Sequence, residues 1–181
     1  MATQQLAFRT CPVTGFKVHL RAEKLIVANA VTAVVFLTLG GIMALLIALT
    51  RWEAVHLLSA DWYYRLTAAH GLTMLVFWIV FFEIAGLYFG GAVVLNSRLP
   101  KPGLGWTAFA LMFIGAVMAE VMVFIGQATV MFTAYVPLKA HPLYYLGIVL
   151  FAVGAFVAVG LFFASLVVAK VEKRYEGSLP L

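Results

Sequence analysis

The chain has 181 residues, of which 65% are hydrophobic and only 10% are charged, and its formal net charge is +5. Soluble domains are about half apolar and about a quarter charged, so this composition excludes a soluble globular protein and predicts an integral membrane protein. The basic residues lie at the ends of apolar segments, so we interpret the positive charge as a topology signal and not as a nucleic-acid-binding surface.

Four apolar segments follow one another along the chain, at about 25–50, 66–95, 106–135 and 143–169. At a rise of about 1.5 Å per residue, each is long enough to cross a hydrocarbon layer of roughly 30 Å as a helix. The predicted fold class is therefore all-α: an integral membrane four-helix segment with an N-terminal segment at 1–24 and a tail at 170–181. The first apolar run is too long, and too far from the N-terminus, for a signal peptide, so we expect a retained helix.

The distribution of lysine and arginine predicts which ends of the helices face the cytoplasm. Three polar segments share most of the 12 basic residues: 1–24, 96–105 and 170–181. The other two loops hold only Arg51, Arg65 and Lys139. By the positive-inside rule, both termini are expected in the cytoplasm.

One histidine stands out because it lies inside an apolar segment. His70 comes a few residues into the second segment, whereas His19, His56 and His141 precede the first segment or lie in outer loops. A polar group in hydrocarbon needs a partner, and a metal suits a neutral imidazole. This chain alone cannot supply a second membrane histidine. Two interpretations therefore stay open: His70 is a structural residue bonded to a neighbouring helix, or it binds a metal whose opposite ligand comes from another polypeptide.

Small residues next to this histidine predict close approach of helices or of a flat cofactor. Gly71 follows His70, Gly40 and Gly41 lie on the first helix, and Gly86 and Gly90 have GxxxG spacing on the second. For the GxxxG pair we expect simple helix packing.

Two carboxylates lie within the apolar segments, Glu83 on the second and Glu120 on the third. Counted from the inner ends of their helices, both are expected roughly 20 Å into the membrane. An ionised carboxylate is costly at that depth, so each should be protonated or hydrogen-bonded. If the two face each other, they could share a proton, and they are our proton-transfer candidates. The alternative is a neutral hydrogen-bonded packing pair.

Several motifs carry a resemblance to a known family. They are Leu66-Thr-Ala-Ala-His-Gly, then Phe113-Ile-Gly, then Ala128-Thr-Val-Met-Phe-Thr-Ala-Tyr, and the long Tyr135-Val-Pro-Leu-Lys-Ala-His-Pro-Leu-Tyr-Tyr-Leu-Gly. From Tyr64 to about Val159 the chain resembles the opening part of subunit I of the haem–copper oxygen reductases, particularly the B-type branch.

The resemblance implies that His70 is an axial ligand of the low-spin haem, of a type that the sequence does not specify. It also implies a respiratory terminal oxidase that reduces oxygen to water, with electron transport and proton translocation in a prokaryotic cytoplasmic membrane. The high-spin haem and copper ligands of this family lie on later helices. This chain is therefore expected to be catalytically incomplete and to need a companion chain that carries the remaining helices. The other expected partners are a subunit II-like electron-entry subunit, a cytochrome or copper-protein donor, and membrane lipid.

Two other functions stay open at this point. The first is nitric oxide reduction, because nitric oxide reductases share the core of this superfamily. The second is a haem-free structural or assembly subunit that retains the same helices.

Overall fold

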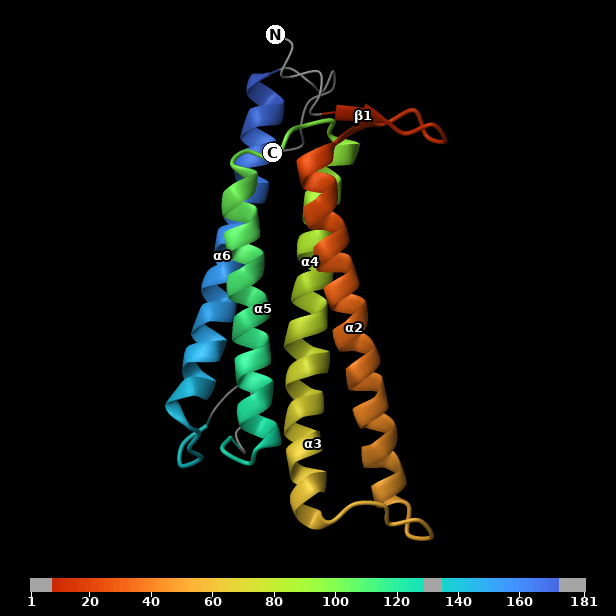
Figure 1. The fold of residues 1–181 in the computed structure, drawn as a ribbon, viewed down its shortest axis with the longest axis vertical. Coiled ribbons are helices and arrows are strands. Elements are labelled where there is room, and N and C mark those ends of the chain that lie inside the picture. Colours follow the sequence, from red (N-terminus) through yellow and green to blue (C-terminus); the bar gives the residue numbers. More distant parts are fainter. Residues whose placement is uncertain (1–7, 129–134, 173–181) are drawn as a thin grey trace.

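The computed structural model describes residues 8–128 and 135–172. Within them, four long apolar helical segments run side by side as an elongated bundle (Figure 1). The first is α2 (Leu20–Arg51), the third α5 (Pro102–Phe124) and the fourth α6 (Pro142–Val171). The second is one continuous rod made of α3 (Ala60–Leu72), η1 (Thr73–Phe77), α4 (Trp78–Phe89) and η2 (Gly90–Val94), in which both η segments are π-helical. The all-α prediction of four membrane-spanning helices is confirmed.

The ends of the helices differ from the expected ones where backbone geometry, and not hydropathy, ends a helix. α2 begins at Leu20 and α3 at Ala60, each five or six residues before the expected start. α5 ends at Phe124, well short of the expected Tyr135. Gly126 follows with a φ of +76°, a left-handed conformation that glycine adopts at a helix C-terminus. The sequence beyond it remains apolar, so a hydropathy count does not register the stop.

The four helices associate as two hairpin pairs. α2 packs mainly on α3 and α4, and α5 packs along most of its length on α6, while α3 meets α5 and α4 meets α6. β1 (Phe8–Thr10), η2 and the last turn of α6 lie at the same end of the bundle (Figure 1). With four spans that alternate in direction, the segments before the first span and after the fourth lie at the same end. The assignment of that end to the cytoplasm remains a prediction.

Glycines in α5 and α6 let the backbones of these two helices approach each other closely. A Cβ placed on Gly147 would lie 2.7 Å from the Gly115 carbonyl oxygen and 3.0 Å from the Ala119 nitrogen. By contrast, a Cβ on Gly86 or Gly90 would meet nothing within 4 Å in the described part of the chain. The GxxxG spacing on the second span therefore does not mark a helix interface here, and the expectation of packing through those glycines is wrong for the described residues.

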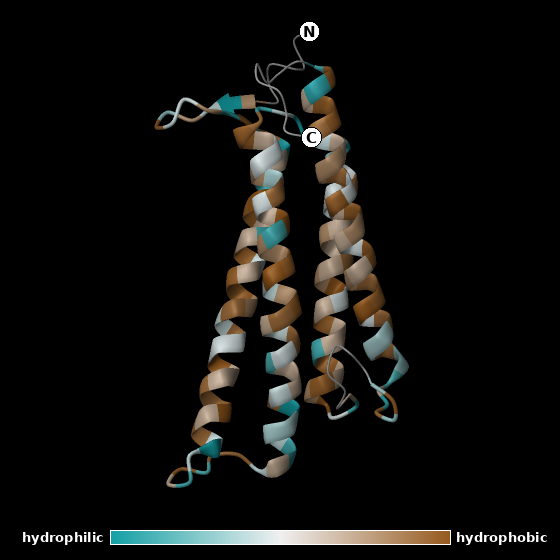
Figure 2. Ribbon diagram, turned by 180° about the vertical axis from the view of Figure 1, so that it is seen from behind, coloured by the Kyte–Doolittle hydropathy of each residue, from teal (hydrophilic) through white to brown (hydrophobic). Residues whose placement is uncertain are grey.

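Apolar side chains cover the outside of the bundle as well as its core. Brown hydrophobic positions extend around all four helices (Figure 2), and large residues such as Phe156 and Leu75 are well exposed. A soluble protein buries most such residues, whereas a membrane protein turns them to lipid or to neighbouring helices.

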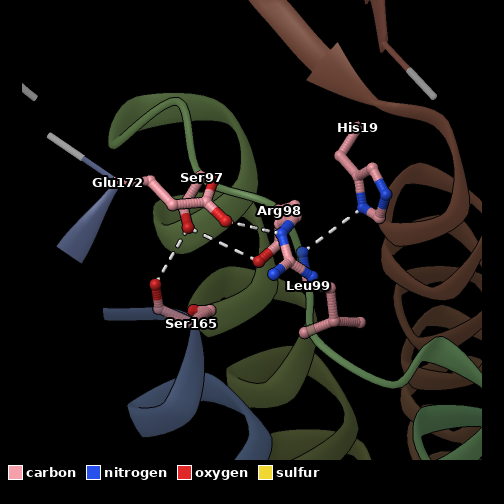
Figure 3. Close-up of polar contacts among 6 residues, drawn as sticks. All are labelled: His19, Ser97, Arg98, Leu99, Ser165 and Glu172. Atoms are coloured by element: carbon pink, nitrogen blue, oxygen red, sulfur yellow. Dashed lines mark hydrogen bonds and ion pairs between the residues drawn. The ribbon is translucent and has the colours of Figure 1, made fainter. Parts of the chain in front are cut away.

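A cluster of polar contacts fixes the loop between η2 and α5 (Figure 3). Ser97 Oγ donates a hydrogen bond to the Ser165 carbonyl at 2.9 Å, and Arg98 Nε donates to Glu172 Oε1 at 2.8 Å. The Leu99 amide donates to Nδ1 of buried His19 at 3.3 Å. These contacts join the loop to α6 and to the start of α2, and they account for His19 as a structural residue.

A short hairpin precedes α2, in the N-terminal segment, for which the sequence analysis predicted no particular secondary structure. β1 pairs antiparallel with β2 (Lys17–His19), and Cys11 lies in the turn between them. Hydrogen bonds from the Thr14 side chain and backbone to the thiolate lower the Cys11 pKa to about 7.

Because the thiolate is the reactive form, we expect Cys11 to be alkylated by iodoacetamide at half its maximal rate near pH 7. Replacing Thr14 with valine removes the strongest of these hydrogen bonds and should move the midpoint upward, toward that of an ordinary thiol, while Thr10→Val should leave it in place. Mass spectrometry of the labelled chain as a function of pH measures both. A midpoint that is unchanged in Thr14→Val would refute this assignment.

Candidate functional site

His70 is anchored to the neighbouring helix through one of its ring nitrogens. It lies two residues before the end of α3, partly buried, and its Nδ1 is 3.0 Å from the carbonyl oxygen of Gly40 on α2. A carbonyl oxygen only accepts, so Nδ1 carries the proton and donates it. The other nitrogen, Nε2, is then the unprotonated one, with a lone pair available to a metal.

Gly40 allows this contact because it has no side chain. A Cβ at that position would lie 2.8 Å from Met74 Cγ and 3.2 Å from Thr73 Cγ2. A larger residue would require the Met74 and Thr73 side chains to shift. The expectation of a close approach at Gly40 is therefore confirmed, and its partner is the π-helical segment that follows His70.

The backbone changes its winding directly after His70. The Thr73–Phe77 segment is π-helical, and the Thr73 amide lies against the carbonyls of both Ala69 and His70. Single π-helical turns are frequent at functional sites, because they alter the direction of side chains on either side. The apolar sequence Thr-Met-Leu-Val-Phe gives no signal for this change, so the sequence analysis missed it.

Glu120 is buried and bonded to the same segment. Thr73 Oγ1 donates to Glu120 Oε1 at 2.6 Å, and Glu120 is only 9% exposed. The second carboxyl oxygen, Oε2, is also buried and has no hydrogen-bond partner among the described residues. The sequence analysis found the glutamate but not its threonine partner, whose only signal was a hydroxyl three residues after His70.

Glu83 does not face Glu120. It is exposed on α4, about 11 residues or roughly 16 Å from the Val94 end of the second span. Glu120 lies 18 residues or roughly 27 Å from the start of α5. The idea of a facing pair is therefore wrong, because the two carboxyls differ in depth by roughly 11 Å and because Glu83 is exposed whereas Glu120 is buried. A proton-transfer role for Glu83 stays a prediction.

A cavity of about 410 Å³ lies between α2, α3 and α5. Its walls are apolar apart from Thr73 and Glu120, and its other lining residues include Phe36, Met43 and Val121. The lining residues do not include His70, so the cavity and the imidazole are separate features connected through Thr73.

The remaining histidines of the described chain do not complete a metal site. His56 is exposed in the loop after α2, and His141 accepts a hydrogen bond from the Leu143 amide at the start of α6. No group of three histidine, cysteine or acidic residues with metal-binding geometry occurs among residues 8–128 and 135–172. His70 can therefore offer one ligand, and further ligands would have to come from outside the described residues.

Comparison with known families decides the class of protein. The model of the family described as Cytochrome C and Quinol oxidase polypeptide I matches residues 24–181. The chain belongs to this family.

Two relatives of this oxidase polypeptide I chain agree with the assignment. This chain is 34% identical over 97 residues to cytochrome c oxidase subunit 1 of Thermus thermophilus, and the match covers 54% of this chain and 17% of that protein. Its fold matches a chain in a cryo-EM structure of a haem–copper terminal oxidase dimer with a TM-score of 0.72 and 25% identity, covering 84% of this chain and 26% of that one. The chain thus spans about a sixth of the length of the curated relative and matches an N-terminal part of subunit I.

The family carries haem and copper as cofactors in an oxidoreductase complex, and the geometry at His70 fits one of them. Metal-bound histidines usually donate their second ring N–H to a carbonyl or carboxylate, which fixes the tautomer and orients the ring. The Nδ1 contact with the Gly40 carbonyl has this form. Histidine, cysteine and acidic side chains are not grouped in threes among the described residues, so His70 is the single candidate metal ligand that this geometry supports there.

Proposed function

We propose that this chain forms the first four helices of subunit I in a B-type haem–copper oxidase, and that His70 is an axial ligand of the low-spin haem. The observation that carries the proposal is the Nδ1 hydrogen bond to the Gly40 carbonyl at 3.0 Å, which leaves Nε2 as the metal-binding nitrogen. Resemblance in sequence around His70 supports the same role.

Within such a site, the residues of this chain would orient the haem ligand. Gly40 fixes the imidazole plane, and the packing of Met74 on Gly40 keeps α2 and the second span together. Apolar side chains surround the turn, and a low-dielectric environment of this kind influences the reduction potential of a bound iron. When bound, the haem supplies one-electron transfer toward the site of oxygen reduction.

The rest of the reaction belongs to other chains or segments. We infer a companion that carries the remaining helices with the second low-spin ligand, the high-spin haem and copper, together with an electron-entry subunit served by a cytochrome or small copper protein. The complex resides in a prokaryotic cytoplasmic membrane, with both ends of this chain on the cytoplasmic side, where its basic residues are concentrated. It reduces oxygen to water and translocates protons.

Purifying the native complex through a tag on this chain tests the proposal. We expect two haems and copper, a second polytopic chain rich in membrane histidines, and oxygen consumption with a reduced cytochrome or copper protein as donor. Consumption of nitric oxide in place of oxygen would assign the related reductase activity. Absence of haem from the complex would leave only a structural or assembly role.

A further inference from the structure

Glu120 is the one buried carboxyl in the described helices that the role of His70 leaves unexplained. One of its oxygens accepts the Thr73 hydrogen bond at 2.6 Å, and the other is buried without a hydrogen-bond partner among the described residues. Burial of an ionised carboxylate in hydrocarbon is costly unless it is paired, whereas a protonated one is far cheaper to bury. One hydrogen bond from Thr73 compensates only a small part of the free-energy cost of burying a charged carboxylate. The protonation state of Glu120 should therefore respond to other charges nearby.

Among the described residues, the surroundings of Glu120 offer no permanent counter-charge at close range. The cavity walls from α2 are apolar, and the wall from α3 adds only Leu66. From α6, the Tyr144 phenol lies within electrostatic reach. The nearest cation on α3 is Arg65, whose guanidinium donates to the Phe124 carbonyl at 3.0 Å and pairs with Asp61 at 2.7 Å. Arg65 thus already has two partners, and the one on α5, Phe124, lies one helical turn beyond Glu120.

An iron held by His70 would bring a variable charge to the helix that carries Thr73, the hydrogen-bond partner of Glu120. Thr73 is three residues after His70, less than one helical turn, and its amide lies against the His70 carbonyl. An oxidised iron porphyrin has one positive charge more than the reduced form. It therefore favours an ionised carboxylate next to it, and in a low-dielectric medium this attraction is strong.

We propose that Glu120 is a redox-linked proton site that binds a proton when the low-spin haem held by His70 is reduced. The electron comes from the donor of the oxidase and reduces ferric to ferrous iron. The proton comes from water and forms the O–H bond on Glu120 Oε2. The site then gains no net charge. On oxidation of the iron the proton returns to water. This inference rests on the proposed role of His70.

Glu120 lies nearer to one end of the bundle than to the other. It lies four residues before the end of α5, so roughly 6 Å of helix separates it from the loop at that end of the bundle. Thr73, which bonds to Glu120, lies 13 residues or roughly 20 Å from the start of α3, so a proton would pass along that part of the second span and would not have to cross the whole membrane.

The experiment compares Glu120→Gln with Glu83→Gln in the assembled complex. The glutamine at 120 keeps the acceptor for Thr73 but cannot titrate, and the control removes an exposed carboxyl from the same bundle. Two quantities are measured: the pH dependence of the low-spin haem midpoint potential, and the redox-induced infrared difference spectrum in H₂O and D₂O.

For the wild type we expect the potential to fall as pH rises, by at most about 59 mV per pH unit, the value for one proton per electron. A deuterium-sensitive C=O band of a protonated carboxyl should appear on reduction. Glu120→Gln should flatten the pH dependence and abolish the band, Glu83→Gln should preserve both, and Thr73→Val should shift the band. An unchanged slope and band in Glu120→Gln would overturn the inference.

Failure of this inference differs from failure of the proposed function. If the low-spin haem is present and requires His70, but its potential does not depend on Glu120, only the redox-linked site is refuted. If the complex has no low-spin haem that requires His70, the proposed function itself fails.

Discussion

Replacing His70 with alanine is expected to remove the low-spin haem from the assembled complex. The alanine removes the imidazole that donates to the Gly40 carbonyl, and on the proposed role of His70 it would also remove one of the ligands that keep the iron low-spin. Loss of a group that only supports a metal ligand costs about 10–100-fold in affinity or activity, and loss of the ligand itself should cost more. We therefore expect oxygen consumption to fall more than about 100-fold and the low-spin EPR signal to disappear.

The matched control for this experiment is His56→Ala. His56 is an exposed imidazole in the loop after α2, and its removal should leave both the haem content and the EPR spectrum unchanged. Pyridine haemochrome analysis then reports how many haems each variant retains. A full low-spin signal in the His70→Ala complex would mean that the imidazole is only a structural hydrogen-bond donor.

Replacing Gly147 with alanine is expected to destabilise the pairing of α5 with α6. The added Cβ would lie 2.7 Å from the Gly115 carbonyl oxygen, a backbone atom that cannot move aside without shifting its helix. Overpacking of this kind costs about 1–3 kcal/mol. Alanine is intrinsically the better helix former by roughly 1 kcal/mol, so a loss of stability would have to come from the helix contact.

Gly160→Ala on the same helix is the control, because a Cβ there meets nothing within 4 Å. We expect it to match or slightly exceed the wild type in the temperature at which the complex loses its haem, while Gly147→Ala loses haem several degrees lower. Equal temperatures for the two variants would show that the close contact of α5 with α6 does not contribute to stability.

The sequence predicted the number and nature of the helices because hydrophobic length is a direct requirement of the bilayer. It could not predict where α5 ends, because the stop depends on the left-handed conformation of Gly126 and the residues beyond it are still apolar. It also predicted a helix contact through Gly86 and Gly90, whereas Gly115 and Gly147, which lie on different helices, make the close approach. Spacing along one helix does not identify the partner on another.

The residues of the candidate site could be predicted from the sequence, but their contacts with other helices could not. His70 is conspicuous as the one imidazole in an apolar run, but the Gly40 carbonyl that fixes its tautomer is a backbone group 30 residues away. Glu120 was found by its charge, whereas its contact with Thr73 depends on how α3 and α5 are rotated about their axes. Hydropathy gives depth in the membrane and carries no information on that rotation.

A structure of the native complex at a resolution that separates haem from side chains tests the central claim most directly. The account predicts a porphyrin iron bonded to Nε2 of His70, with Nδ1 still donating to the Gly40 carbonyl and an imidazole from outside the described residues on the opposite face. A His70 ring with no iron at Nε2 would contradict it.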